Sequence, residues 1–394
     1  MDYFTENIEE NERRNRRQEE IARMRREKQR QMKRRRRMKI LLTRGVGVVA
    51  VVLLLTVAVT AFRSKPEEIA ETGVGAEKHT SWFSFGKEEE GVIGETEEMV
   101  SAKAEIPESG NEENSDGNIP KEIEVYNFSS NSETASIWNE EIISSNAILV
   151  DESTDTIVAS KGAKERISPA SMTKVLTVLV AAELLTEEQL EDTFVMTREI
   201  TDYGYINDCS SVGFLEGEEI PVRDLFYGTI LPSGSDAAVG LATYVAGSHE
   251  AFVELMNKKL EELELAESSH MTNCVGIYDE NHYSTVYDMA VIMKAAMQNE
   301  WCKEVLSEHN YTTQETVQHP EGINISNWFL RRIEDKETGG EVLCAKTGYV
   351  RQSKSCAVSY GTFENGKSYI CVTAGSSSSW RCIYDHVDIY NQYI

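Results

Sequence analysis

The chain has 394 residues, of which 66 are acidic and 40 basic, and its formal net charge at pH 7 is -26. Basic residues are most concentrated near the N-terminus and the remainder is strongly acidic, so the two parts are expected to face different compartments or partners. The seven cysteines are an odd number with no CxxC pair, which argues against a metal site. Nothing in the composition indicates a cofactor.

Residues 1–40 form a basic segment with runs such as RRNRR and KRRRRMK. The segment lacks the folded framework and interleaved aromatic residues of a nucleic-acid-binding module, so no nucleic-acid partner is expected. Contact with anionic lipid explains its charge better.

Residues 41–62 are predicted to form one transmembrane anchor, because the run GVGVVAVVLLLTVAVTAF is uncharged and mostly apolar. The Lys and Arg residues before it place the N-terminus in the cytoplasm and everything after it outside the cell membrane. A cleaved signal peptide is the alternative, since Val59 and Ala61 resemble a small-residue cleavage site.

Residues 63–140 are rich in Glu, Ser, Gly and Asn and show no sustained hydrophobic period, which predicts an acidic flexible linker. Residues 141–394 then carry the patterning of one folded domain. Its expected strands are NAILVD, TIVAS, EVLCAKTG, SCAVSYGTF and KSYICVTAG. The last two are joined around Asn365-Gly366, a strong hairpin signal.

Helices are expected between residues 171 and 308, and a last amphipathic helix over residues 380–393. Strands at both ends of the domain predict an α/β fold with one antiparallel sheet that joins the N- and C-terminal strands. Helices would flank this sheet, and the middle of the domain would form a mostly helical subdomain.

The stretch SPASMTKVLTVLV places Ser171 three residues before Lys174 at the head of a buried helix. Burial and the helix dipole both disfavour a second positive charge there, so the lysine is pushed towards its neutral form. A neutral amine beside a serine is a general base beside a nucleophile. Because this spacing also occurs by chance, the interpretation needs support from elsewhere in the chain.

Two further motifs supply that support: Ser233-Gly234-Ser235 in LPSGSDAA, and Lys346-Thr347-Gly348 in CAKTGY. The pair Ser171 and Lys174 comes first in the chain, and these two motifs follow it. In having the three motifs in this order, the chain resembles the penicillin-recognising serine enzymes of the β-lactamase/DD-peptidase type. Within that group residues 145–394 look like the D-alanyl-D-alanine carboxypeptidases among the low-molecular-weight penicillin-binding proteins. The resemblance implies a peptidoglycan stem peptide as substrate and β-lactams as inhibitors.

Each motif has a chemical task in this interpretation. Ser171 would attack the carbonyl between two D-alanines and hold the acyl group as an ester, with Lys174 accepting its proton. Ser233 would pass that proton to the departing amine. Lys346 would keep Lys174 neutral and attract the terminal carboxylate of the substrate.

The remaining predicted site residues bind substrate. Thr347 would hydrogen-bond the carboxylate, and Gly348 would leave room for the substrate backbone. By resemblance, the backbone N–H groups of Ser171 and Tyr349 would hold the oxyanion, and Arg381 would lie near the carboxylate. An exposed arginine at a helix start is the alternative explanation of Arg381.

Ser235 departs from the family pattern, which usually has asparagine there. A shorter hydroxyl would need a bridging water or would position substrate more loosely. Two other functions stay open: a serine β-lactamase, and a non-catalytic penicillin-binding or wall-sensing protein on the same fold. A disulfide between Cys344 and Cys356 across a hairpin is also open, alongside free buried thiols.

Overall fold

The structure is a computed structural model that describes residues 126–137 and 140–394. The predicted basic segment and transmembrane anchor, and most of the predicted linker, lie outside the described residues. Among the residues that the structure describes, no helix has the length and apolar character needed to cross a bilayer.

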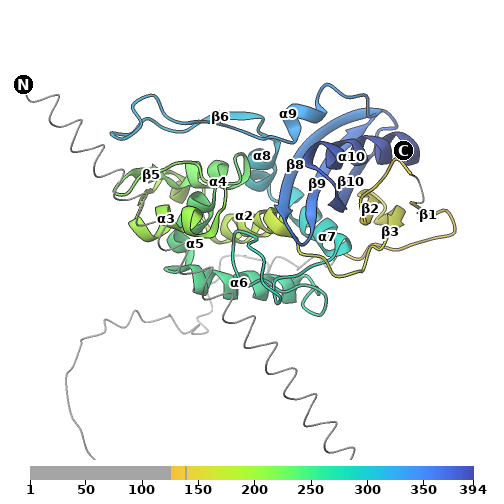
Figure 1. Ribbon diagram of the computed structural model, residues 1–394, viewed down its shortest axis with the longest axis horizontal. Helices are drawn as coiled ribbons and strands as arrows, with labels where there is room; N and C mark the ends of the chain where they lie inside the picture. The colour runs from red at the N-terminus through yellow and green to blue at the C-terminus, as the bar shows by residue number, and fades with distance from the viewer. Residues whose placement is uncertain (1–125, 138–139) are drawn as a thin grey trace, which may run out of the picture. The chain divides into compact units, whose positions relative to one another are not determined.

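The centre of the fold is a six-stranded sheet with the strand order β1-β3-β2-β10-β9-β8 (Figure 1). The strands are β1 (Ala135–Ser136), β2 (Asn146–Asp151), β3 (Thr156–Lys161), β8 (Gly340–Val350), β9 (Lys354–Phe363) and β10 (Ser368–Ser376). Only the short β1 pairs in parallel, with β3. The antiparallel pairing of β2 with β10 joins the two ends of the domain, which confirms the predicted sheet.

Alternation along the strands gives this sheet two apolar faces. In β10, Ile370 and Val372 pack in one hydrophobic cluster, and Cys371 between them packs in the other. The hairpin before β10 turns where expected, since Gly366 has φ 76° and Asn365 Oδ1 accepts a hydrogen bond from Lys367 N–H.

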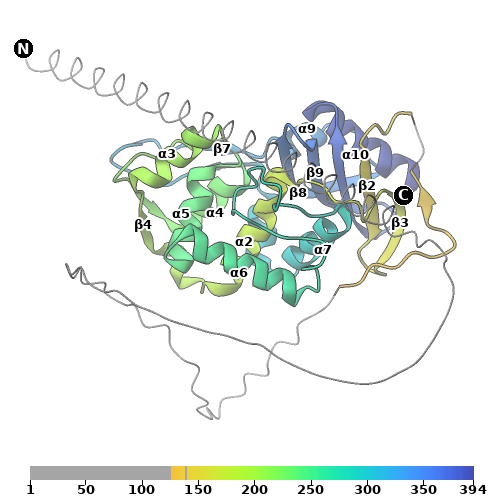
Figure 2. The same cartoon turned by 60° about the horizontal axis from the view of Figure 1, so that its bottom comes forward.

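Helices cover both faces of the sheet, as Figure 2 shows. The helices of the described residues are α2 (Thr173–Leu184), α3 (Arg198–Asn207), α4 (Val222–Ile230), α5 (Ser235–Ala246), α6 (His249–Glu262), α7 (Val286–Met297), α8 (Glu300–Ser307), α9 (Leu330–Ile333) and α10 (Ser379–Tyr393). Two 3-10 turns, η1 (Ala170–Met172) and η2 (Glu188–Glu191), and a small ribbon of β4 (Thr193–Val195) with β5 (Glu219–Pro221) complete this part. Helix α10 packs on one face and α7 on the other. The closing helix and the mostly helical subdomain were both predicted.

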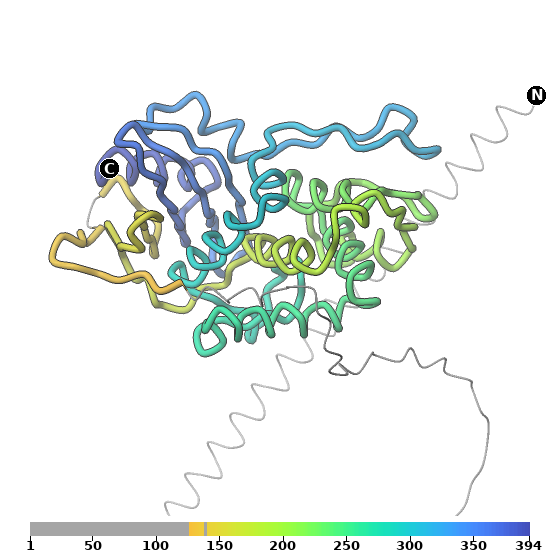
Figure 3. Tube along the Cα trace, turned by 180° about the vertical axis from the view of Figure 1, so that it is seen from behind, coloured from red at the N-terminus to blue at the C-terminus, as the bar shows by residue number. Residues whose placement is uncertain are grey.

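One feature absent from the prediction is the hairpin of β6 (Asn310–Thr312) and β7 (Asn324–Ser326), which runs along the helical part in Figure 3. Buried carboxylates attach it: Tyr311 O–H donates to Asp224 at 2.6 Å, and Thr316 O–H donates to Glu218 at 2.6 Å. Apolar contacts add to these, since Ile325 is buried in the core and Tyr311 stacks on Tyr227, but such scattered apolar residues give the sequence no strong strand period.

The compact fold begins before the predicted boundary at residue 141. Phe128 and Ile137 are buried, and Phe128 N–H donates to Tyr287 O–H at 3.0 Å. These apolar residues are too widely spaced to form a period in the sequence, which is why this stretch was assigned to the linker.

All seven cysteines are free thiols. In the register of β8 with β9, Cys344 lies opposite Tyr360 and Cys356 lies opposite Gly348. The disulfide considered between Cys344 and Cys356 is therefore not formed, because the two residues are not cross-strand neighbours.

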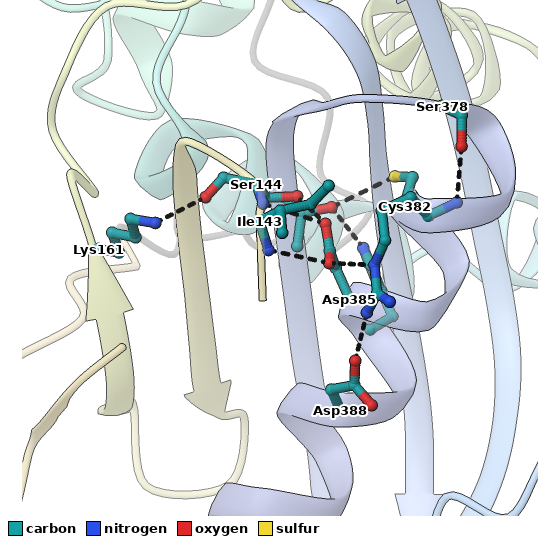
Figure 4. Close-up of polar contacts among 10 residues, drawn as sticks. Ile143, Ser144, Lys161, Ser378, Cys382, Asp385 and Asp388 are labelled. Atoms are coloured by element: carbon teal, nitrogen blue, oxygen red, sulfur yellow. Dashed lines mark hydrogen bonds and ion pairs between the residues drawn. The ribbon is translucent and has the colours of Figure 1, made fainter. Parts of the chain in front are cut away.

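A buried carboxylate, Asp385 in α10, fastens the chain entering the domain to the closing helix (Figure 4). It accepts hydrogen bonds from the backbone N–H groups of Ile143 at 3.2 Å and Ser144 at 3.1 Å. Arg381 Nε donates to the same carboxylate at 2.9 Å and supplies the opposite charge.

Replacing Asp385 should therefore destabilise the domain strongly. Asp385→Ala leaves the buried N–H and hydroxyl groups of Ser144 without their acceptor and removes one of the two partners of Arg381, a loss of about 3 kcal/mol and about 6–12 °C in Tm. Asp388→Ala is the matched control, because Asp388 pairs with the same arginine but is 28% exposed, so its loss should be about 1 kcal/mol or less. Equal Tm shifts in the two variants, measured by calorimetry, would contradict this role.

Candidate active site

A cleft of about 820 Å³ opens between the helical part and the edge strand β8. Predicted site residues from three separate segments line it: Ser171, Lys174, Ser233, Thr347, Gly348 and Tyr349. Lys346 is almost fully buried behind them, and its Nζ donates to Thr347 O at 3.0 Å. The three motifs, far apart in sequence, therefore meet at one place.

Ser171 lies at the head of the predicted helix, on the 3-10 turn η1, and α2 begins after it. The residue before it, Ala170, has φ 49°, a left-handed conformation that is costly for a residue with a side chain. Lys174 is buried on the first turn of α2, with its Nζ 3.2 Å from Ser171 Oγ. The predicted pairing of hydroxyl and amine is present, next to a strained backbone at Ala170.

A loop that sequence reasoning missed holds the amine in place. Lys174 Nζ donates to the carbonyl of Val275 at 2.8 Å. Asn273 Oδ1 accepts the backbone N–H groups of Val275, Gly276 and Ile277, at 3.2, 2.7 and 2.9 Å, and so fixes that carbonyl. The asparagine and glycine in NCVG predict a turn, but they do not predict a contact with a lysine far away in the sequence.

Two glycines allow neighbouring segments to approach the nucleophile closely. At Gly276, with φ 84°, an added Cβ would lie 1.8 Å from Ala170 O and 2.8 Å from Ser171 N. At Gly348 an added Cβ would lie 2.9 Å from Ser171 N. Gly348 therefore makes room for the turn that carries Ser171, in addition to any room it leaves for substrate.

Burial lowers the pKa of Lys174 to about 8, while the Cys209 and Cys274 thiols and the Asp236 carboxylate act in the opposite direction. Burial, and then the charge of Lys174, hold the pKa of Lys346 well below its usual range. The predicted influence was the reverse, with Lys346 keeping Lys174 neutral. Without substrate, the nearby Asp236 favours the charged form of Lys174. Burial alone lowers its pKa and so makes the neutral amine available at moderate pH.

Ser233 has two unusual properties. Its φ is 61°, and its hydroxyl is buried with no hydrogen-bond partner among the described residues. A strained residue with an unsatisfied hydroxyl on the wall of a cleft is typical of a group placed for a ligand or a reaction.

Ser235 and Arg381 are not among the residues that line the cleft. The Ser235 hydroxyl is buried and donates to the carbonyl of Ser210 at 2.8 Å. This hydrogen bond ties Ser235 to Ser210, which lines the cleft, so the Ser235 side chain supports the cleft wall and does not face the cleft. Arg381 is held by Asp385 and Asp388 on its own helix, and it is partly buried there rather than exposed.

A cation that was not predicted, Arg351, lines the cleft at the turn between β8 and β9. It is exposed and has no ion-pair partner in the part of the chain that the structure describes. Its position in the sequence, shortly after Lys346-Thr347-Gly348, could have suggested that it lies at the cleft.

The buried histidines are structural. His282 Nε2 lies 2.8 Å from Thr173 Oγ1, and its Nδ1 accepts the Thr272 N–H at 3.1 Å. Burial lowers the pKa of His282 to about 4, so the ring is neutral. These contacts attach the first turn of α2 to the loop that holds Lys174.

Comparison with known proteins agrees with this geometry. The family model for D-alanyl-D-alanine carboxypeptidases, peptidase family S11, matches residues 131–378. The chain belongs to this family. The match includes all three motifs and the loop around Asn273.

Among curated relatives, the D-alanyl-D-alanine carboxypeptidase DacF of Bacillus subtilis is 30% identical over 235 residues, which are 59% of this chain and 57% of DacF. DacC of Escherichia coli is 36% identical over 152 residues, 38% of each chain. The match thus spans little more than half of the length of DacF.

Among solved structures, the Streptomyces K15 DD-transpeptidase superposes with a TM-score of 0.58 at 26% identity, over 64% of this chain and 98% of that one. Penicillin-binding protein 5 of Haemophilus influenzae gives a TM-score of 0.57 at 25% identity, over 63% of this chain and 70% of that one. The sheet and helical part described above therefore form the fold of DD-peptidases.

Gly276→Ala should displace the nucleophile, because the new methyl group would overlap Ala170 O. We expect the rate of Ser171 acylation by a fluorescent penicillin to fall by about a hundredfold or more, as displacements near 1 Å can cause. The control is Gly247→Ala: Gly247 has a similar φ of 77°, but nothing lies within 4 Å of an added Cβ.

Both variants place a side chain on a left-handed backbone and should lower Tm, and Gly276→Ala should lower it further because of the overlap with Ala170 O, so the rates are compared at a temperature at which both variants are folded. Similar acylation rates in the two variants would contradict the steric role of Gly276.

Proposed function

We propose that the protein is a serine-type D-Ala-D-Ala carboxypeptidase, which removes the terminal D-alanine of peptidoglycan stem peptides through a Ser171 acyl-enzyme. The observation that carries the proposal is the 3.2 Å separation between Ser171 Oγ and the buried Lys174 amine, in a cleft shared with Ser233. Membership of the D-alanyl-D-alanine carboxypeptidase family supports the choice of substrate.

In the acylation step, Ser171 Oγ attacks the carbonyl carbon of the penultimate D-alanine while neutral Lys174 accepts the hydroxyl proton. The C–N bond then breaks, and the Ser233 hydroxyl relays the proton to the departing amine of D-alanine. In the second step, water attacks the ester, gives a proton to the same relay and releases the shortened peptide with Ser171 restored.

The oxyanion of each tetrahedral intermediate would accept hydrogen bonds from Ser171 N–H and Tyr349 N–H, worth about 3 kcal/mol each. The close approach of β8 to this turn supports the pairing, since the Cβ position of Gly348 lies 2.9 Å from Ser171 N. Preorganised backbone donors of this kind need no rearrangement during the reaction.

Lys346, Thr347 and Arg351 would receive the terminal carboxylate. A carboxylate beside Lys346 raises the pKa of that amine and makes it the cation. The new charge then lowers the proton affinity of Lys174, so substrate binding itself produces the neutral base. Arg381 could reach the carboxylate only by leaving Asp385 and Asp388.

The location of the enzyme is also part of the proposal. The basic N-terminal run and the apolar residues 41–62 support a single-pass anchor with a cytoplasmic N-terminus. The catalytic domain would then lie on the outer side of the membrane, where it can reach peptidoglycan and β-lactams. The sequence places this domain at residues 141–394, and its packed residues begin at 126.

The direct test is to incubate the full chain with a peptide that ends in D-Ala-D-Ala and to measure free D-alanine. Release by the natural protein, and none by Ser171→Ala, is expected. Equal release by both, or none by either, would reject the enzymatic function and favour a wall-sensing protein. Rapid turnover of penicillin instead of slow release would favour a β-lactamase.

The pH dependence of the reaction follows from the lowered pKa of Lys174. The base is active when neutral, so kcat/KM should rise with pH through a midpoint near 8 and level off above it. The midpoint in kcat should be lower, because the bound carboxylate makes Lys346 the cation. A kcat/KM that is flat or falls between about pH 6.5 and 8.5 would contradict this assignment.

A further inference from the structure

An aromatic and cationic platform lies beside the cleft, formed by Trp328, Arg332 and Trp380. The Arg332 guanidinium lies 3.9 Å from the ring centroid of Trp328 and 5.3 Å from that of Trp380. The two indole rings meet edge to face, with centroids 5.8 Å apart. Trp380 is 48% exposed, so the platform presents a large apolar surface to solvent.

The platform is continuous with the active-site cleft. Trp328 lines the cleft, and so does Ser379, the neighbour of Trp380 at the start of α10. A ligand that fills the cleft and extends beyond it on this side therefore meets Trp380.

The platform is also rigidly attached to the strand that carries Lys346. Asn327 Nδ2 donates to Ala345 O at 3.0 Å, and its Oδ1 accepts the Phe329 N–H at 3.1 Å. Arg332 is fixed by its own hydrogen bond to Trp328 O at 3.0 Å. Behind the platform, α9 and α10 pack together through buried apolar residues. Such support is expected for a binding surface and is not needed by an incidental surface aromatic.

Arg332 has unused hydrogen-bonding capacity. Within the described residues it has no carboxylate partner, and its Nε is buried without an acceptor. A guanidinium only donates, through N–H groups in a planar fork, so it suits a neutral or anionic ligand that is rich in carbonyl oxygens.

We propose that this platform binds the glycan strand of peptidoglycan, with a pyranose ring stacked on Trp380 and an N-acetyl or lactyl carbonyl group accepting from Arg332. The inference rests on the proposed function, since it assigns a site to the sugar that bears the stem peptide. A stem peptide of about four extended residues spans roughly 13 Å, so a sugar held at the cleft rim can present its peptide to Ser171. The enzyme would thereby prefer peptides attached to glycan over free peptides.

The test compares two substrates with the full chain: a free pentapeptide ending in D-Ala-D-Ala, and the same peptide attached to a disaccharide of the glycan. Trp380→Ala should lower kcat/KM for the sugar-linked substrate by about tenfold, mainly through KM, a change equal to about 1.4 kcal/mol. Its kcat/KM for the free peptide should stay within about twofold of the natural value. Arg332→Gln should show the same selectivity.

The control is Tyr384→Ala, which removes another exposed aromatic of α10 that is 40% exposed and does not belong to the platform. This variant should leave both substrates unchanged. The proposal would be overturned if Trp380→Ala lowered kcat/KM equally for the two substrates, or lowered it for neither. The second result is also the one expected if the platform binds a protein partner.

A second measurement separates this proposal from the catalytic one. A tetrasaccharide of β-1,4-linked N-acetylglucosamine should change the tryptophan fluorescence of the inactive Ser171→Ala protein, and the change should be lost on adding Trp380→Phe. Binding without D-alanine release by the natural protein would reject the carboxypeptidase and keep the platform. Release without any sugar effect would reject the platform and keep the carboxypeptidase.

Discussion

The site depends on one constraint: an amine, Lys174, is kept out of water beside a hydroxyl. Only burial lowers the pKa of this lysine towards neutral pH. Its position on the first turn of α2 brings the amine next to Ser171. Much of the surrounding fold can be understood as support for this pair. The apolar length of α2 is buried over most of its residues, and the Val275 carbonyl fixes the position of the amine by accepting a hydrogen bond from it.

The catalytic pair also explains where strain and close contacts are concentrated. Ala170 and Ser233 have left-handed backbones, and Gly276 and Gly348 lie where no side chain would fit. Each of these features increases the crowding around Ser171. The rest of the domain must therefore supply enough stability to hold strained residues in place, and the buried Asp385 between the two ends of the chain is one such source.

The sequence was informative where a local pattern has one structural meaning. The strands that contain Val150 and Val372, the turn at Gly366 and the apolar helix after Lys174 follow from period and turn chemistry alone. The three motifs predicted a shared cleft, although they are separated by many residues. Ser235 and Arg381 were different, because the resemblance gave their positions in the chain but not the direction of their side chains.

Other features could not be read from the sequence for physical reasons. The contact between Val275 and Lys174 joins two distant backbone segments and leaves no local pattern. The order in which Lys174 and Lys346 lose their protons depends on burial and on Asp236, which the motifs do not encode. The β6–β7 hairpin is held by Glu218 and Asp224, whose role is visible only once the chain is folded.

The most direct test of the central claim is the pKa of Lys174 itself, measured by NMR titration of labelled lysine side chains in the full chain. The signal would be assigned by its absence from Lys174→Gln. A midpoint near 8 is predicted for the free protein. A value near the 10.5 of an ordinary lysine would show that burial does not lower the pKa of this amine, and the account of Ser171 as a nucleophile activated by Lys174 would then be wrong.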